Sequence, residues 1–160
     1  MKNMLTITDY ATVFTAIATS VAAIFVLLEL RHMEKHRNLE ISMKLFEWAE
    51  TDRLRKAFWW VEKEFVFEEF DKHRANVQNK LEASDYPDQV EAYFEEVGFL
   101  VNKKFVDIDV IADRLNADIA SNWKKLEPWI IAMRKERNDE TFGEHFQTLY
   151  EKIVKPKRKS

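Results

Sequence analysis

The feature that most constrains this chain is an uncharged apolar run near its start. Residues 10–28 read YATVFTAIATSVAAIFVLL, and the only polar groups in this run are hydroxyls. A helix of about 19 residues is about 28 Å long, which approaches the thickness of the hydrocarbon core of a bilayer. A core helix of a small soluble protein normally has a polar face, and this run has none. The sequence therefore predicts a transmembrane helix over residues 10–30.

Basic residues on the two sides of this run predict its orientation. Lys2 stands alone before the run, whereas Arg31, Lys35 and Arg37 follow it closely as a basic collar at the membrane interface. Basic residues are enriched on the cytoplasmic side of membrane spans. The following segment, LELRHMEKHR, contains no small-residue cleavage site of a signal peptide. We therefore expect a single-pass protein of the cell (inner) membrane, in contact with lipid, with residues 1–9 outside and residues 31–154 in the cytoplasm.

Beyond this run the apolar residues recur every three or four positions. Two of the predicted apolar stripes are Val90, Phe94, Val97 and Val101, and Ile111, Leu115, Ile119 and Trp123. No long segment alternates with the period of a strand. We expect the first helix to extend to about Glu50, with later helices near the following signals. The predicted helix starts and breaks are Thr8–Asp9, Thr51–Asp52, the EASDYPDQ segment around Pro87, Asp107 and Pro128. Pro128 either starts, kinks or re-caps a helix. The predicted fold class is all-α, with the transmembrane helix continuing into a cytoplasmic helical bundle and a basic tail over residues 155–160.

Composition excludes several classes of chemistry. The chain has no cysteine, so it has no disulfide, thiolate zinc site or cysteine nucleophile. Its two glycines, Gly98 and Gly143, lie in different segments and cannot form a phosphate-binding loop. A formal net charge of -3 provides no bulk basic field for nucleic acid. We expect no catalysis, no cofactor and no nucleic-acid partner.

Two groups of side chains suggest metal chemistry but are incomplete. Glu29, His32 and His36 follow the spacing of one half of a carboxylate-bridged metal site, and the chain lacks the second half. Their position favours a membrane-interface collar. The glutamates at 91, 95 and 96 share a predicted helix, and we expect them to form a solvated face. Gly98 in the same helix is either a close-packing point or a weak spot.

Two other sets of residues predict contact surfaces. The small residues on one face of the transmembrane helix are Thr12, Ala16, Ser20 and Ala23. Small residues let helices approach closely in lipid, so this face predicts a partner helix, although a span that floats alone has the same composition. The aromatic residues Trp48, Trp59 and Trp60 cannot all share one narrow stripe, because consecutive residues point about 100° apart on a helix. They form a candidate partner surface, or else they fill a broad core.

The chain resembles the prokaryotic proteins grouped as domain of unknown function 4760. The resemblance is carried by LLELRHMEKHRNLEISMKLFEWAE, EVGFLVNKKFVDIDVIADRL, NWKKLEPWIIAMRKER and FGEHFQTLYEKI. The recurring residues of that family fall on Trp123, Pro128, Trp129, Arg134, Phe146 and Tyr150. The resemblance implies a single N-terminal span followed by a helical cytoplasmic domain, and it implies no activity.

These observations favour a non-catalytic, membrane-tethered adapter or small accessory subunit that binds a protein partner or a second copy of itself. One alternative is a membrane-anchored sensor or effector whose helical domain binds a ligand in an apolar pocket with a few convergent polar groups. A second alternative is a metal-dependent membrane enzyme that uses Glu29, His32 and His36.

Overall fold

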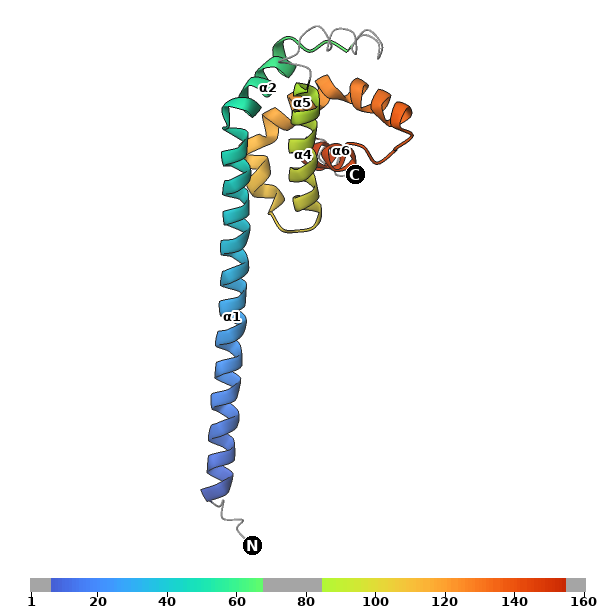
Figure 1. Cartoon of the computed structure of the whole chain (residues 1–160). Coiled ribbons are helices and arrows are strands. Elements are labelled where there is room, and N and C mark those ends of the chain that lie inside the picture. Colours follow the sequence, from blue (N-terminus) through green and yellow to red (C-terminus); the bar gives the residue numbers. More distant parts are fainter. Residues whose placement is uncertain (1–6, 68–84, 155–160) are drawn as a thin grey trace, which may run out of the picture. The chain divides into compact units, whose positions relative to one another are not determined.

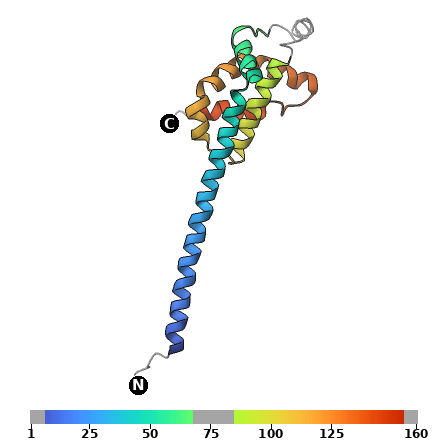
Figure 2. The ribbon, with the colours of Figure 1, turned by 60° about the vertical axis from the view of Figure 1, so that its left-hand side comes forward.

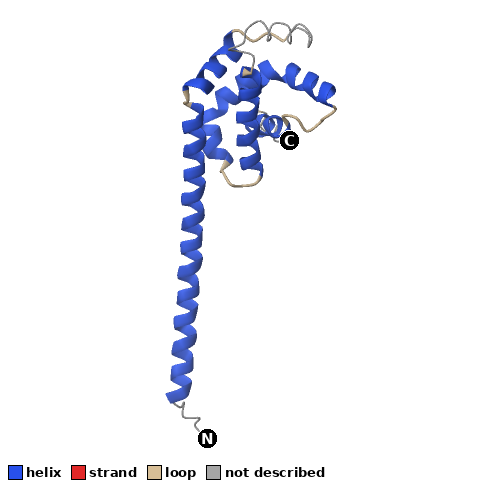
Figure 3. Cartoon of the chain, viewed as in Figure 1, coloured by secondary structure: helices blue, strands red, loops and turns tan. Residues whose placement is uncertain are grey.

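The computed structural model describes residues 7–67 and 85–154 (Figure 1). These residues form the helices α1 (Ile7–Ala49), α2 (Asp52–Lys63), α4 (Tyr86–Asn102), α5 (Ile108–Arg137) and α6 (Glu144–Ile153). Figure 3 shows no strand among them, so the predicted all-α fold is confirmed. Lys2 and the predicted basic tail lie outside the described residues. The chain divides into two compact units, residues 1–39 and residues 40–160.

In the first unit, α1 exposes its apolar side chains. Its most apolar window has a mean hydropathy of 2.3, and none of that window is buried. Phe14, Ile24 and Phe25 are all more than half exposed. Among the described residues, α1 is the one helix long and apolar enough to cross a membrane. It already includes Ile7, so Thr8 lies inside the helix rather than at its cap.

Four hydroxyl groups of this segment are satisfied within α1. The Thr12 and Ser20 hydroxyls donate to the carbonyl oxygens four residues earlier at 2.8 Å. Thr15 and Thr19 make the same contact at 2.9 and 2.8 Å. A polar group in lipid must find its hydrogen bond within the protein. These four side chains therefore meet that requirement without a second chain.

In the second unit, α4 packs against α2, α5 and α6, and Figure 2 shows these helices gathered in one bundle. The predicted apolar stripes are confirmed as core. Their buried members are Val90, Phe94, Val97 and Val101 of α4 and Ile111, Leu115, Ile119 and Trp123 of α5. The ring of Phe94 stacks on that of Phe146 at 4.6 Å, and Trp123 meets Phe146 edge-on at 5.1 Å. Aromatic packing of this kind joins α4, α5 and α6.

The helix boundaries follow local chemistry. Asp107 caps α5 as predicted, because its carboxylate accepts a hydrogen bond from the Asp109 amide at 3.0 Å. Thr51 is the N-cap of α2, but its hydroxyl donates back to the Trp48 carbonyl at 2.8 Å. Pro87 lies in the first turn of α4, where its missing amide hydrogen costs nothing. Pro128 lies inside α5, which continues to Arg137 and changes direction along its course in Figure 1.

Candidate functional site

Three glutamates of α4 occupy three different environments. Glu96 is exposed, Glu95 is half-buried, and Glu91 is only 6% exposed. The expectation of a uniformly solvated acidic face is therefore wrong for Glu91. Glu91, Glu95 and Gly98 are separated by four and three positions and so share one face of α4. That face packs against the start of α6.

Gly98 explains how α6 comes so close. A β-carbon at this position would lie 2.2 Å from the carbonyl oxygen of His145, a distance no side chain tolerates. Of the two expectations for Gly98, close packing is the one the structure shows. The approach brings the Glu95 carboxylate to the N-terminus of α6, where it accepts hydrogen bonds from the amides of His145 at 3.1 Å and Phe146 at 2.9 Å. Glu95 therefore satisfies the free amides of α6 and complements its dipole.

Glu91 lies one turn before Glu95 and has no hydrogen-bond partner within the described part of the chain. Its Oε1 lies 3.6 Å from the position that a β-carbon on Gly143 would occupy. Burial, reinforced by the negative charges of Glu95 and Asp88, raises the pKa of Glu91 to about 8, although Arg137 opposes the shift. At neutral pH this carboxyl group is mostly protonated.

The segment between α5 and α6 is held in place by its own hydrogen bonds. Asp139 accepts from the amide and the hydroxyl of Thr141 at 2.9 and 2.6 Å. Arg134 donates from Nε to the Phe142 carbonyl at 2.8 Å and from a terminal nitrogen to Gln147 at 3.0 Å. Gly143 adopts a φ of +69°, which favours glycine, and begins α6. The segment is therefore built to keep a fixed shape.

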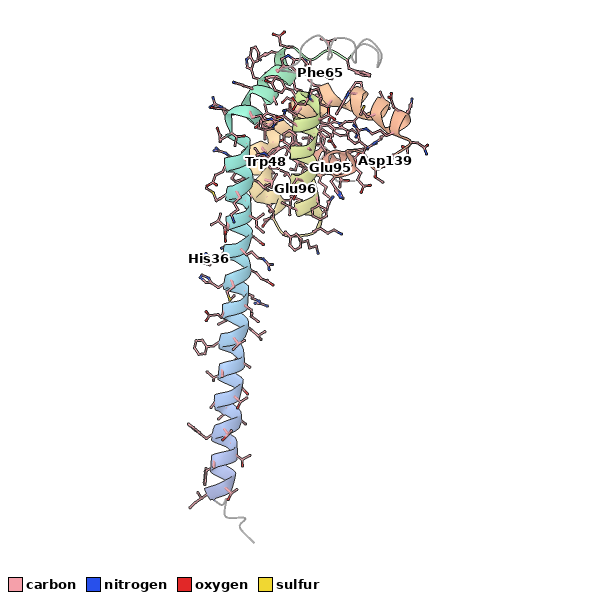
Figure 4. The ribbon with its side chains drawn as sticks, in the orientation of Figure 1. His36, Trp48, Phe65, Glu95, Glu96 and Asp139 are labelled. Atoms are coloured by element: carbon pink, nitrogen blue, oxygen red, sulfur yellow. The ribbon has the colours of Figure 1, made fainter. Side chains whose placement is uncertain are left out.

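A pocket of about 510 Å³ lies between this segment and α4. Its walls combine the carboxylates of Glu91, Glu95, Glu96 and Asp139 with the rings of Phe99 and Phe142, and also include His145. Figure 4 shows Glu95 and Glu96 on α4 and Asp139 after the end of α5. None of the described lysines and arginines lines the pocket. We call these residues the acidic pocket; its chemistry is that of a site for a positively charged or hydrogen-bond-donating group.

The predicted helix–helix face of α1 is fully accessible. Thr12, Ala16, Ser20 and Ala23 are all exposed. The basic collar residues Arg31, Lys35 and Arg37 are exposed as well. Both sets lie in the first unit, and their roles in lipid remain predictions.

The three tryptophans predicted as a partner surface have separate surroundings. Trp48 is 42% exposed, meets the Tyr93 ring edge-on at 5.2 Å and lines a groove of about 230 Å³ with Leu54 and Ala92. Trp59 is 58% exposed. Trp60 is half-buried and packs against Phe65 and Tyr86. Trp60 therefore belongs largely to the core, whereas Trp48 and Trp59 present ring surface.

The histidine pair lies on the exposed surface of α1. His32 and His36 are hydrogen-bonded through their Nε2 atoms at 2.8 Å, with ring centres 4.3 Å apart. Across the described ranges, no group of three or more histidine, aspartate or glutamate side chains is arranged to hold a metal ion.

Sequence reasoning missed the burial of Glu91, yet a signal for it exists. A glycine seven positions after a glutamate lies on the same helix face, and a glycine inside a helix marks a close approach of another element. The pair Glu91 and Gly98 therefore places a carboxyl group on a face that is later covered.

Comparison with known proteins agrees with the architecture. The family model described as Domain of unknown function (DUF4760) matches residues 14–153, which include most of the apolar run of α1 and the helices α2, α4, α5 and α6. Neither the curated proteins nor the solved structures contain a significant match. Since the matched residues make up most of the chain, this protein belongs to the DUF4760 family.

Proposed function

We propose that this chain is a non-catalytic, single-pass membrane protein that acts as a membrane-tethered adapter or small accessory subunit. In this proposal the apolar segment of α1 spans the cell membrane, residues 1–9 lie outside, and the helical bundle lies in the cytoplasm. The bundle is then held at the inner face of the membrane, where it binds a protein partner or a second copy of the chain.

One observation carries this proposal: the most apolar stretch of α1 has no side chain buried within the described part of the chain. The window with mean hydropathy 2.3 is entirely unburied, and its large side chains, such as Phe25 at 67% exposed, face outward. Exposure of so large an apolar surface to water is unfavourable by about 25 cal/mol for each Å². A bilayer removes that cost, and the internally bonded hydroxyls of Thr12 and Ser20 let the helix enter it.

The association surface in this proposal is the small-residue face of α1. Because the hydroxyls of this face are already bonded to the helix backbone, close van der Waals packing between helices is the attraction that remains. The exposed rings of Trp48 and Trp59 offer a second contact surface on the bundle. No charged residue interrupts residues 10–28, so lipid and a second helix can both cover this segment.

The test uses two leucine substitutions that differ only in their helix face. Ala16→Leu adds bulk to the small-residue face, whereas Ala18→Leu adds the same bulk about 200° around the helix. Two differently tagged full-length copies are expressed together, extracted in mild detergent, co-purified and sized. We expect Ala16→Leu to weaken association about tenfold and Ala18→Leu to leave it unchanged.

Two results would contradict this account of the span. One is a wild-type chain that is monomeric and lacks a stoichiometric partner in mild detergent. The other is an equal effect of the two leucine substitutions, because general damage to the helix would then explain the loss.

A further inference from the structure

The acidic pocket contains a carboxyl group that the fold itself does not use. Glu95 is occupied by two amides of α6, and Asp139 is occupied by Thr141. Glu91 is 6% exposed and accepts no hydrogen bond within the described part of the chain, yet it lines an open pocket. A buried carboxyl group without a partner is destabilising. A ligand that donates hydrogen bonds to it would remove that cost.

We propose that the acidic pocket binds the guanidinium or ammonium group of an organic cation, with Glu91 as its counter-ion and Phe99 and Phe142 as apolar walls. This inference goes beyond the adapter function and does not depend on the membrane anchor.

Charge and volume favour an organic cation over other ligands. Four acidic side chains and, among the residues that the structure describes, no lysine or arginine line the pocket, so an anion would be repelled. The described residues hold no cluster suited to a metal ion, and about 510 Å³ is far larger than a bare ion requires. The aromatic rings in the walls suit a cationic head with an alkyl chain, since aromatic faces attract cations.

Arg137 and Lys103, two described cations near the walls of the pocket, do not fill this role. The guanidinium carbon of Arg137 lies 4.6 Å from the centre of the Phe142 ring, and a terminal nitrogen lies 3.7 Å from Asp88. Arg137 acts on Glu91 through its charge and makes no hydrogen bond to it. The amine of Lys103 lies 5.8 Å from the Phe99 ring centre and does not line the pocket. A ligand cation would therefore add a contact that the described residues do not supply.

Binding should be coupled to release of a proton. The pKa of Glu91 is about 8 in the free protein, because burial and the carboxylates of Glu95 and Asp88 outweigh the charge of Arg137. The cation binds the ionised form, so the affinity should rise with pH until about pH 8 and then level off. His145 and Asp139 also face the pocket, and the Glu91→Gln variant separates their contribution from that of Glu91.

The experiment measures binding of butylguanidinium to the full chain in detergent micelles by isothermal titration calorimetry. Butylurea is the matched control ligand, because it has nearly the same shape but no charge. We expect butylguanidinium to bind at least about tenfold more tightly than butylurea, and its affinity to rise from about pH 6 to about pH 8.

The matched variants are Glu91→Gln and Glu127→Gln, which remove the same charge. Glu127 is exposed on α5 and does not line the pocket. We expect Glu91→Gln to weaken butylguanidinium binding about tenfold or more and to abolish the pH dependence, and Glu127→Gln to change neither. Circular dichroism checks that both variants keep their helices, and the wild-type pH dependence tests the proposal even where a variant does not fold.

A second titration distinguishes two sources of the guanidinium group, a free small cation and an arginine side chain of a protein. The blocked peptide Gly-Gly-Arg-Gly-Gly is titrated beside butylguanidinium. Binding of butylguanidinium alone assigns the pocket to a small cation, whereas binding of the peptide assigns it to a basic side chain of a protein. Failure of both to bind, equal binding of butylurea, or unchanged binding by Glu91→Gln overturns the inference while leaving the adapter proposal standing.

Discussion

The two units of this chain use apolar side chains in opposite ways. In residues 7–39 the large apolar side chains are exposed on a single helix, whereas in residues 40–67 and 85–154 most of them fill a core shared by several helices. Phe25 is 67% exposed, and Phe146 is completely buried. Phenylalanine therefore lies in two different environments. Other side chains of the bundle surround Phe146, whereas the described residues leave Phe25 exposed. This difference supports the proposal that the apolar segment of α1 spans a membrane.

The largest effect is expected when charged residues are placed in the exposed apolar segment of α1. Val21→Asp together with Ile24→Asp should release the chain from the membrane, because each aspartate at the centre of a span costs about 2.5–3.5 kcal/mol. Carbonate extraction of membranes measures the outcome. Ile131→Asp is the matched change at an exposed apolar residue of the bundle and should leave the chain in the membrane pellet. Equal behaviour of the two variants would contradict the assignment of α1.

Removing one aromatic ring from each unit tests whether the two units contribute differently to the free energy of unfolding. Phe146→Ala should lower the free energy of unfolding of the bundle by about 3–5 kcal/mol, because Phe146 packs between Phe94 and Trp123. Phe25→Ala should leave that free energy unchanged, since Phe25 is exposed in the first unit. Denaturant unfolding in detergent, followed by tryptophan fluorescence, measures both. A loss of similar size in the two variants would show that the units are not separate in stability.

The pH dependence of stability tests the buried carboxyl group of Glu91, which has no hydrogen-bond partner among the described residues. The pKa of Glu91 is about 8 in the folded chain, against an ordinary glutamate pKa of 4.5, because burial disfavours the charged form. Between these values the folded state binds the extra proton, so the free energy of unfolding falls as pH rises, by at most about 1.4 kcal/mol for each pH unit. Glu91→Gln should flatten the curve between pH 4.5 and about pH 8. Parallel curves for the wild type and the variant would refute the burial of an ionisable group here.

The smallest expected effect is that of Gly98→Ala, which should change the stability of the bundle in the opposite direction to the usual effect of replacing a helical glycine by alanine. Glycine to alanine in an exposed helix is stabilising by about 1 kcal/mol. Gly98→Ala should instead destabilise the bundle by about 1–3 kcal/mol, because the new methyl group would lie 2.2 Å from the His145 carbonyl oxygen. Thermal unfolding measures the sign. A stabilised variant would mean that α4 and α6 are not in close contact.

Local patterns predicted most of the helical framework. The uncharged run of residues 10–28, the cap at Asp107 and the stripe from Ile111 to Trp123 each depend on near neighbours in the sequence, and the structure bears out all three as helix, cap and core. The predicted choice among start, kink and re-cap at Pro128 could not be settled in this way, because packing of α5 against other helices decides whether the helix continues.

The acidic pocket was harder to predict because it depends on tertiary contacts. Glu91 and Glu96 have the same charge and lie on one helix, but only the docking of α6 buries the first and leaves the second exposed. The capping role of Glu95 joins residues 50 or more positions apart, which no local pattern contains. Trp60 differs from Trp59 for the same reason, since Phe65 and Tyr86 cover its ring.

The most direct test of the central claim is the topology of the chain in intact cells. Because the sequence has no cysteine, Asn3→Cys and Glu127→Cys each create a single labelling site. A membrane-impermeant maleimide is applied before and after permeabilisation, and the unsubstituted chain serves as the blank. We expect the cysteine at position 3 to react in intact cells and the cysteine at position 127 to react only after permeabilisation. Labelling of position 127 in intact cells, or recovery of the chain in the soluble fraction, would contradict a cytoplasmic bundle tethered by α1.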